Sequence, residues 1–479
     1  MTDTQDLPRN TVFSALSAAS NVLLVVLVIF AGRILGDSSY GKFSLALAIA
    51  SIFEMPIDFG LSTLIVKNVA RDRGLAGRYL SLIVPWKLVL SFAVMLMLIP
   101  TAHVLGKSSD ARTAIYAMGF AIVLRSFKAT THAFFRAFER FDLVLLTTYT
   151  ERVLVVIVCG LMLFKTRSLL PFTFAFALAR VPDLIFSYWL LNRSIARLGW
   201  RADASLIKSI QRDAFPFGSL NIVTVLYAYL GTVILGVFRA PAEVGWYSAG
   251  YRIYEGLTMF PYIFCAVLLP RLSYLYVKDR SRHAELSARG FKYALILSLP
   301  IASCGWLLAP QVLTTVFGRG YLHGTQALRM LMIATVFMFS NWLLNTILIS
   351  TDKQTAVLKV SATGLAISAC AHVILVRLYG ATGAGISALI AEVCVFLMFM
   401  RLASREILTA RMFAMTWRPA MACLSAAAAL FWSGLGTSLI QAAVFSGVYA
   451  IVLLGLRTFD SRERSALKSI FLLSTKPPD

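Results

Sequence analysis

The sequence has few charged residues, which excludes an ordinary soluble protein. Charged side chains make up 14% of the 479 residues, whereas a soluble domain carries about 25%. Hydrophobic residues make up 58%, and the mean hydropathy is +0.76. The first apolar run, from Val12, follows a polar, non-basic start without a small-residue cleavage site, so we interpret it as a membrane helix and not as a signal peptide. The chain is predicted to be an all-α polytopic membrane protein.

The chain also lacks the patterns of several kinds of chemical site. All six cysteines lie inside apolar runs, and no CxxC or Cys/His spacing is present, so neither a disulfide framework nor a metal site is predicted. There is no Walker A motif and no arrangement of a nucleophile with a general base. The sequence therefore predicts that the protein is not an enzyme and needs no cofactor.

Acidic residues are scarce relative to basic ones, with 23 Asp and Glu against 45 Lys and Arg. Loops with three or more basic residues alternate with loops that carry one or two, as topology signals do in membrane proteins. This distribution predicts that both termini are cytoplasmic. It also argues against nucleic acid as a partner, because the positive charge follows the loops instead of forming one patch.

Long apolar runs are abundant, and fourteen of them approach the roughly 20 residues that a membrane helix needs. The longest cytoplasmic connection, about Asn192 to Ala214, divides the first twelve into two pseudo-symmetric six-helix lobes. We predict an N-terminal lobe at 1–200, a C-terminal lobe at 201–404, and two additional helices with a cytoplasmic tail at 405–479. The predicted helices are Val12–Leu35, Phe43–Val66, Leu80–Ala102, Thr113–Phe135, Leu143–Phe164, Leu169–Leu191, Phe215–Phe238, Val244–Leu269, Tyr293–Phe317, Ala327–Ile349, Ala356–Val376, Gly380–Met400, Pro419–Leu435 and Thr437–Leu456.

Two stretches about two hundred residues apart share one layout. Each has a polar turn that ends in Gly-x-aromatic-Ser, where x is any residue, at 36–44 and at 239–248, and each is followed by an apolar run with a proline, Pro56 or Pro261. Matching Gly41 with Gly245 pairs the second predicted helix with the eighth, as two parallel six-helix repeats require. Two homologous lobes with kinked helices are the architecture of a transporter, and the paired prolines are predicted to serve as hinges.

The fourth predicted helix carries a basic stripe. Its members, at spacings of three, four and four residues, share one helical face: Arg125, Lys128, His132 and Arg136. Ionisable groups at membrane depth cost several kcal/mol unless they are paired or hydrated. Because four basic groups outnumber the acids that any one helix presents, we favour a water-filled cavity in which these residues bind an anionic substrate.

Two acidic residues inside the second predicted helix have two possible roles. Glu54 and Asp58 lie four residues apart on one face of the second helix, on either side of Pro56. They are either structural partners of the basic stripe or a site for a coupling cation, H⁺ or Na⁺.

Three further groups of opposite charge lie close together in the sequence. Arg180 with Asp183, and Glu151 with Arg152, are predicted to form ion pairs that join helices. Arg252 and Glu255, in the second lobe, are either such a pair or substrate-binding residues, and Glu392 is a separate acid in the twelfth helix.

Several short motifs, in order along the chain, resemble a known family. Arg33-Ile-Leu-Gly36, Asp58-Phe-Gly60 and Val244-Gly245-Trp-Tyr-Ser-Ala-Gly-Tyr-Arg252 look like turns of the polysaccharide flippases of the multidrug/oligosaccharidyl-lipid/polysaccharide (MOP) exporter superfamily. Phe134-Phe-Arg136 is similar to the end of their fourth helix, and Tyr379-Gly380 to a later turn. The resemblance spans the first twelve helices. Its motifs are structural turns, so they indicate the fold more strongly than the substrate.

The resemblance implies translocation of a polyprenyl-pyrophosphate-linked oligosaccharide from the cytoplasmic to the outer leaflet by alternating access. The pyrophosphate would be held by the basic stripe, together with Arg252. It also implies a bacterial-type plasma membrane, contact with membrane lipid, and other polysaccharide-assembly membrane proteins as partners. A peptidoglycan-precursor flippase and a drug/cation antiporter of the same superfamily remain alternatives. A membrane-embedded enzyme, such as a sugar polymerase or an acyltransferase, is a further alternative, and the polymerase is disfavoured because the large outer loop expected of one is missing.

Overall fold

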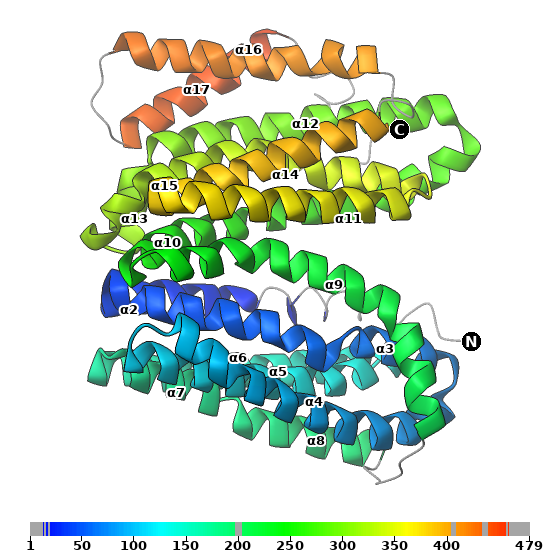
Figure 1. Cartoon of the computed structure of the whole chain (residues 1–479). Coiled ribbons are helices and arrows are strands. Elements are labelled where there is room, and N and C mark those ends of the chain that lie inside the picture. The colour runs from blue at the N-terminus through cyan, green and yellow to red at the C-terminus, as the bar shows by residue number, and fades with distance from the viewer. Residues whose placement is uncertain are drawn as a thin grey trace. The chain divides into compact units, whose positions relative to one another are not determined.

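Every regular element of the described chain is a helix. The computed structural model describes residues 13, 16–17, 20–196, 204–403, 409–433, 439–456 and 458. Figure 1 shows the helices in chain order. They are α2 Asn21–Asp58, α3 Leu61–Arg71, the 3₁₀ turn η1 Arg73–Leu75, α4 Ala76–Leu105, α5 Ser109–Ala137, α6 Phe141–Thr166, α7 Leu169–Leu178, α8 Val181–Ser194, α9 Ala204–Phe238, α10 Pro241–Leu257, α11 Met259–Lys278, α12 Arg280–Leu307, α13 Ala309–Val316, the 3₁₀ turn η2 Arg319–Gly324, α14 Thr325–Ser350, α15 Gln354–Ala403, α16 Thr409–Ser433 and α17 Leu439–Gly455.

The helices confirm an all-α membrane architecture. Nine helical stretches of the described residues are long and apolar enough to cross a membrane. Two of them, Asn21–Arg71 with 51 residues and Gln354–Ala403 with 50, are more than twice the length that one crossing needs. The stretch of α5 is not among the nine, because its basic side chains interrupt the apolar run. The predicted count of fourteen crossings stays a prediction.

The chain forms two compact units. The first unit contains residues 1–249, 316–324 and 372–384, and the second contains 250–315, 325–371 and 385–479. The predicted lobe boundaries, at 200/201 and 404/405, fall outside the described residues. The division into two six-helix lobes therefore stays a prediction.

Helix α5 is the central element of the first unit. It packs against α2, α3, α4, α7 and α8. Its buried positions are rich in alanine, glycine and threonine, and small side chains let neighbouring helix backbones approach closely. The hydroxyl of Ser108 caps its first turn by accepting a hydrogen bond from the Ala111 backbone N–H at 3.3 Å. This packing holds the basic face of α5 among several helices and not against one.

Two glycines bend the longest helices sharply. Gly36 has φ 78° inside α2, and Gly380 has φ 56° inside α15. Glycine adopts positive φ without steric cost, whereas other residues rarely do. Gly36 lies between two predicted helices and Gly380 is the first residue of the predicted helix Gly380–Met400, so the structure has a tight kink at each place where the sequence predicted a turn.

The two repeated glycine turns pack against each other within the first unit. A Cβ atom at Gly41 would overlap the carbonyl oxygen of Pro241, and one at Gly245 would overlap the carbonyl oxygen of Asp37. The indole Nε1 of Trp246 donates to Asp37 Oδ2 at 2.8 Å. The contact is thus reciprocal, with each glycine admitting the backbone of the other turn.

Other connections reach the same end of the first unit. The hydroxyl of Tyr321 in η2 donates to the Gly32 carbonyl at 2.7 Å. Arg239 Nε donates to the Val376 carbonyl at 3.0 Å, and Lys107 Nζ donates to the Arg239 carbonyl at 2.9 Å. Segments that the sequence assigns to outer loops are therefore joined in one hydrogen-bonded cap.

Several predicted helices are broken in two. The predicted span Phe43–Val66 breaks at Phe59 and Gly60, which have φ 31° and 79°, and Val244–Leu269 breaks between α10 and α11 at Thr258. Leu169–Leu191 breaks between α7 and α8 beside Arg180. Pro56 and Pro261 each lie three residues from one of these breaks, so both prolines accompany interruptions of the helix.

The second unit is built around α12, which packs against α11, α14, α16 and α17. Its N-cap, Asp279, accepts a hydrogen bond from the Arg282 backbone N–H at 3.0 Å. Glu392 is buried here: its carboxylate accepts from the Tyr254 hydroxyl at 3.0 Å and from Asn341 Nδ2 at 2.7 Å. These hydrogen bonds connect α10, α14 and α15 within the unit.

Candidate functional site: a basic cavity in the first unit

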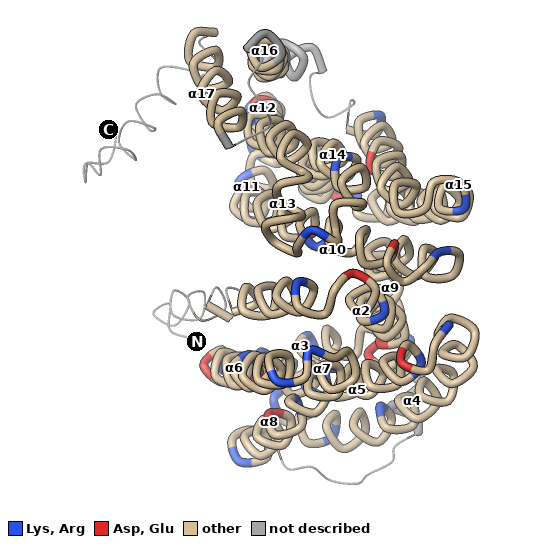
Figure 2. Tube along the Cα trace, turned by 90° about the vertical axis from the view of Figure 1, so that its left-hand side faces the viewer, with Lys and Arg blue, Asp and Glu red and all other residues tan. Residues whose placement is uncertain are grey.

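A cavity of about 390 Å³ lies within the first unit, and the basic stripe of α5 lines it. Figure 2 marks basic and acidic residues along the trace, and both occur within helices of this unit. Four permanently charged basic side chains and one carboxylate face the cavity. The lining residues are Ser17, Asn21, Arg125, Lys128, Ala129, His132, Arg136, Phe141, Val144, Thr148, Glu151 and Arg152. The four residues predicted from helical periodicity thus share one cavity, and Arg152 joins them.

Lys128 is the buried centre of the stripe. Its Nζ donates to Asp183 Oδ2 at 2.6 Å, to Glu151 Oε2 at 2.8 Å and to the Thr147 carbonyl at 2.8 Å. All three ammonium protons are therefore used, and the side chain is only 9% exposed. Lys128 joins α5, α6 and α8, and it stabilises the carboxylate of Glu151, which lines the cavity, and that of Asp183, which does not.

The observed ion pairs differ from those predicted by closeness in sequence. Arg180 Nε donates to Glu151 Oε1 at 3.1 Å, and Asp183 is paired with Lys128, so the predicted Arg180–Asp183 pair is wrong. The helix break beside Arg180 explains the difference, because it places Asp183 in the first turn of α8. There the helix dipole also favours its negative charge. The predicted Glu151–Arg152 pair is present at 3.4 Å.

His132 and Arg136 continue the stripe along α5. The Thr147 hydroxyl donates to the Leu143 carbonyl at 2.8 Å, so His132 Nε2 is the donor in its 2.9 Å contact with that hydroxyl. Arg136 is exposed, and no partner of its guanidinium is found among the residues that the structure describes. Its five N–H donors are available to an anion in the cavity.

Arg125 forms a two-point pair with Glu54 across α5 and α2. Its Nε donates to Glu54 Oε1 at 2.9 Å, and its Nη2 contacts Glu54 Oε2. The Arg125 side chain is 43% exposed and that of Glu54 is 20% exposed. Since Arg125 lines the cavity, an anion there would compete with Glu54 for its guanidinium.

Asp58 is paired with a residue that the sequence prediction missed. Lys87 Nζ donates to Asp58 Oδ1 at 2.6 Å and to the Ser126 carbonyl at 3.0 Å. The Lys87 side chain is fully buried. The sequence feature that could have revealed this pair is a lysine inside the predicted helix Leu80–Ala102, because a charge at that depth requires a partner.

The two predicted site residues of the second unit pair with each other. Arg252 Nη1 donates to Glu255 Oε2 at 2.7 Å within α10, and Glu255 is 40% exposed. The sequence left two hypotheses for these residues, an ion pair or substrate binding, and this contact is the ion pair. A role in substrate binding stays a prediction.

The fold and its charged interior define a class of multi-pass membrane proteins. The structure titled "Lipid II flippase MurJ, inward closed conformation" matches at a TM-score of 0.75, with 13% identity, over 93% of this chain and 99% of that chain. An inward-facing multidrug resistance MATE family transporter of the MOP superfamily matches at 0.66, with 15% identity, over 81% and 94%. The chain therefore has the same fold as these two structures.

Sequence comparison then identifies the family. The model of the polysaccharide biosynthesis protein family matches residues 7–276, which is more than half of the chain, and the chain belongs to this family. A probable low-salt glycan biosynthesis flippase, Agl15 of Haloferax volcanii, is 20% identical over 375 residues, which is 75% of each chain. The resemblance noted in the sequence is confirmed.

Proposed function

We propose that this protein is a flippase that moves a polyprenyl-(pyro)phosphate-linked oligosaccharide from the cytoplasmic to the outer leaflet for surface polysaccharide synthesis. The observation that carries the proposal is the cavity of the first unit, where four permanent cations face one carboxylate. A phosphate or pyrophosphate is a ligand of matching charge, and arginine binds its oxygens through paired N–H donors. The family membership and the flippase named among the relatives support the same function.

The predicted substrate-binding residues serve such a site in two ways. Arg136 and Arg125 present their guanidinium groups to the cavity and are assigned direct contacts with the phosphate. Lys128 and His132 already donate to Glu151 and Thr147, so Lys128 contributes charge and both side chains fix the helices that frame the cavity. Arg152, whose Nε is buried without a hydrogen-bond partner in the described part of the chain, adds a third guanidinium.

Alternating access is proposed as the transport mechanism. The cap that joins the two glycine turns closes one end of the first unit. If both termini are cytoplasmic, as the loop charges predict, this end faces the outside of the plasma membrane. Opening the cap while the cavity closes toward the cytoplasm would release the glycan outward.

Glu54 and Asp58 are proposed to couple transport to a cation, H⁺ or Na⁺. Both carboxylates are engaged here, by Arg125 and by Lys87. A proton or Na⁺ at Glu54 would release Arg125, and a phosphate would then take the place of the carboxylate. Arg252 and Glu255 are proposed as a second contact for the substrate, and membrane lipid and other polysaccharide-assembly proteins as partners.

Neutralising the exposed guanidinium groups is expected to abolish export without loss of protein. Each hydrogen bond to a charged group contributes about 1.5–3 kcal/mol, so Arg125→Gln with Arg136→Gln should weaken binding by a hundredfold or more. Export is measured as lipid-linked glycan that reaches the outer leaflet, normalised to membrane protein level. Arg193→Gln, at an exposed arginine of α8, is the matched control. Wild-type export by the double variant would contradict the assignment of the cavity.

The prolines beside the helix breaks are expected to influence the transport rate. Pro56→Ala and Pro261→Ala restore a backbone donor and straighten the helix locally. Each variant is expected to export about tenfold more slowly, which corresponds to about 1.4 kcal/mol in the barrier. If both kept the wild-type rate in a time course of glycan export, the prolines would not be hinges.

One alternative is favoured by a specific observation. The fold match to the lipid II flippase covers nearly all of both chains, and a peptidoglycan precursor would present the same kind of anionic head group. A drug/cation antiporter is disfavoured, because the basic cavity would repel a cationic substrate. A deletion strain distinguishes the three: viable cells with glycan trapped on the cytoplasmic side support the proposal, lethal lysis supports the precursor flippase, and drug sensitivity with normal glycans supports the antiporter.

A further inference from the structure

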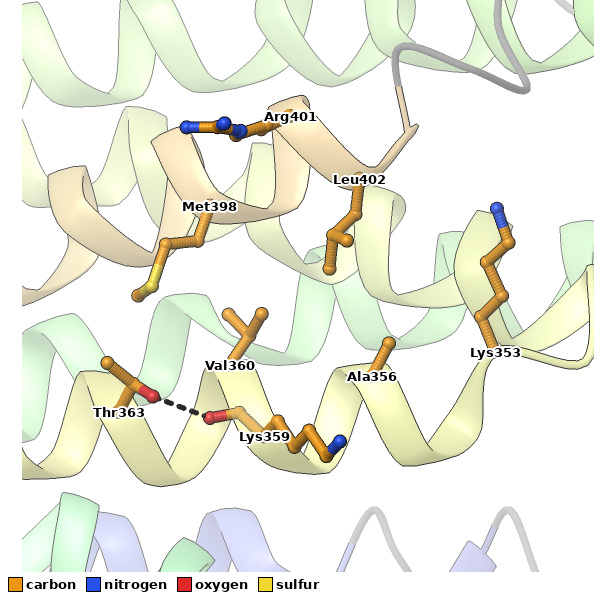
Figure 3. A pocket seen from close by; sticks show the side chains of 8 residues that line it. All are labelled: Lys353, Ala356, Lys359, Val360, Thr363, Met398, Arg401 and Leu402. Carbon is orange, nitrogen blue, oxygen red and sulfur yellow. Dashed lines mark hydrogen bonds between the residues drawn. The ribbon is translucent and has the colours of Figure 1, made fainter.

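A second pocket, separate from the basic cavity, lies within the second unit. It has a volume of about 800 Å³ and is formed by the first and last turns of α15, which run beside each other (Figure 3). Its lining residues are Lys353, Ala356, Lys359, Val360, Thr363, Met398, Arg401 and Leu402. None of the residues assigned to the proposed flippase function belongs to it.

Close packing further along α15 creates the pocket. A Cβ atom at Gly364 would overlap the side chain of Val395, so the two segments approach closely at that level. One to two turns nearer their ends, the larger side chains of Met398 and Leu402 lie across from Val360 and keep the segments apart. The space between the two segments at this level is the groove that these residues line.

The interior of the pocket is apolar. Figure 3 shows Ala356 and Val360 pointing from one segment toward Met398 and Leu402 on the other. Val360 is 7% exposed, and the other three are half-buried. The Thr363 hydroxyl donates to the Lys359 carbonyl at 2.9 Å, so its proton is already used within the helix. Such a surface matches a hydrocarbon chain.

The rim of the pocket is basic. Lys353, Lys359 and Arg401 are three cations among eight lining residues, and none of the eight is acidic. Lys359 and Arg401 are exposed. Asp352 precedes Lys353 in the sequence but does not line the pocket. A basic rim above an apolar groove matches a molecule with an anionic head and an apolar tail.

We propose that this pocket binds an anionic membrane phospholipid. Its phosphate lies among Lys353, Lys359 and Arg401, and one acyl chain lies along Ala356, Val360 and Met398. Basic pockets between membrane helices at the cytoplasmic surface are suited to anionic lipid head groups, and the predicted loop charges place this end of α15 on that surface. A free phosphate would contact only the basic rim. A zwitterionic lipid would fill the apolar groove, but it carries no net negative charge to match the rim.

The test is a lipid titration of the purified full-length protein in detergent, read by native mass spectrometry. The probes are phosphatidylglycerol, phosphatidylcholine and inorganic phosphate. Phosphatidylglycerol is expected to bind at least tenfold more tightly than phosphatidylcholine. Lys359→Gln with Arg401→Gln should weaken phosphatidylglycerol binding by about 30-fold and leave phosphatidylcholine binding unchanged. Both side chains are exposed, so the variant is expected to fold.

A second variant tests the groove without changing charge. Ala356→Phe fills it and should weaken phosphatidylglycerol binding by about tenfold, whereas Leu358→Phe, at an exposed position outside the pocket, should not. Equal binding of the two lipids, wild-type binding by either pocket variant, or displacement of phosphatidylglycerol by equimolar inorganic phosphate would overturn the proposal. None of these results depends on glycan export, so the proposed function is tested separately.

Discussion

Replacing Lys128 with methionine is expected to lower the free energy of unfolding by about 3–5 kcal/mol, the range for removing one partner of a buried ion pair. Among the described residues, Lys128 is the only ion-pair partner of Asp183, and Asp183 Oδ1 already lacks a hydrogen bond. The variant therefore leaves a carboxylate, 1% exposed, without a counter-charge. Thermal unfolding in detergent and the steady-state level of protein in the membrane measure the loss.

A compensating change separates lost pairing from lost packing. Adding Asp183→Asn to Lys128→Met removes the stranded charge and should recover more than half of the lost stability, while Glu151 keeps Arg180 and Arg152. The control is Arg140→Met, which breaks an exposed pair with Asp142 and should cost at most about 1 kcal/mol. Equal losses of unfolding free energy for Lys128→Met and Arg140→Met would show that the buried ion pairs stabilise the protein no more than an exposed pair does.

Replacing Gly41 with valine is expected to prevent closure of the cap at one end of the first unit. The new Cβ atom would overlap the Pro241 carbonyl oxygen and lie 2.8 Å from Gly245 N. Both contacts are with backbone atoms, which cannot move away by a change of rotamer as a side chain can. Overpacking of this kind costs about 1–3 kcal/mol, which shifts a two-state equilibrium about tenfold or more toward the open form. Glycan export should fall accordingly.

The shift is measured by labelling from outside the cell. A single cysteine replaces Ser248, which is 8% exposed, in a chain whose six native cysteines are replaced. A membrane-impermeant maleimide should label it about tenfold faster in Gly41→Val than with Gly41 intact. Gly160→Val is the control, because a Cβ atom there meets nothing within 4 Å. Equal labelling rates in all three proteins would mean that the reciprocal turns do not form a gate.

The bends at Gly36 and Gly380 could be predicted from sequence because positive φ is a property of a single position. The absence of a side chain at Gly41 and Gly245 has a different cause, because each glycine admits backbone from a segment about 200 residues away. Helical periodicity likewise predicted that the stripe from Arg125 to Arg136 shares one face, and the cavity contains all four residues.

The ion pairs could not be predicted in the same way, because they join helices that lie far apart in the sequence. Arg125 and Glu54 are 71 residues apart, and Lys128 and Asp183 are 55 apart. The argument that basic groups outnumber acids on one helix failed for Lys128, whose two carboxylates come from two different helices. Lys87 was missed because a single lysine in an apolar run has no periodic signal.

The most direct test of the flippase assignment is transport in liposomes that contain the purified full-length chain and a polyprenyl-pyrophosphate-linked oligosaccharide in the inner leaflet. A membrane-impermeant glycosidase reports the glycan that reaches the outer leaflet. Wild-type protein is predicted to expose the glycan, whereas Arg125→Gln with Arg136→Gln is predicted to leave it protected, as in liposomes without protein. Exposure at the same rate with the double variant, or no exposure with the wild type, would contradict the account.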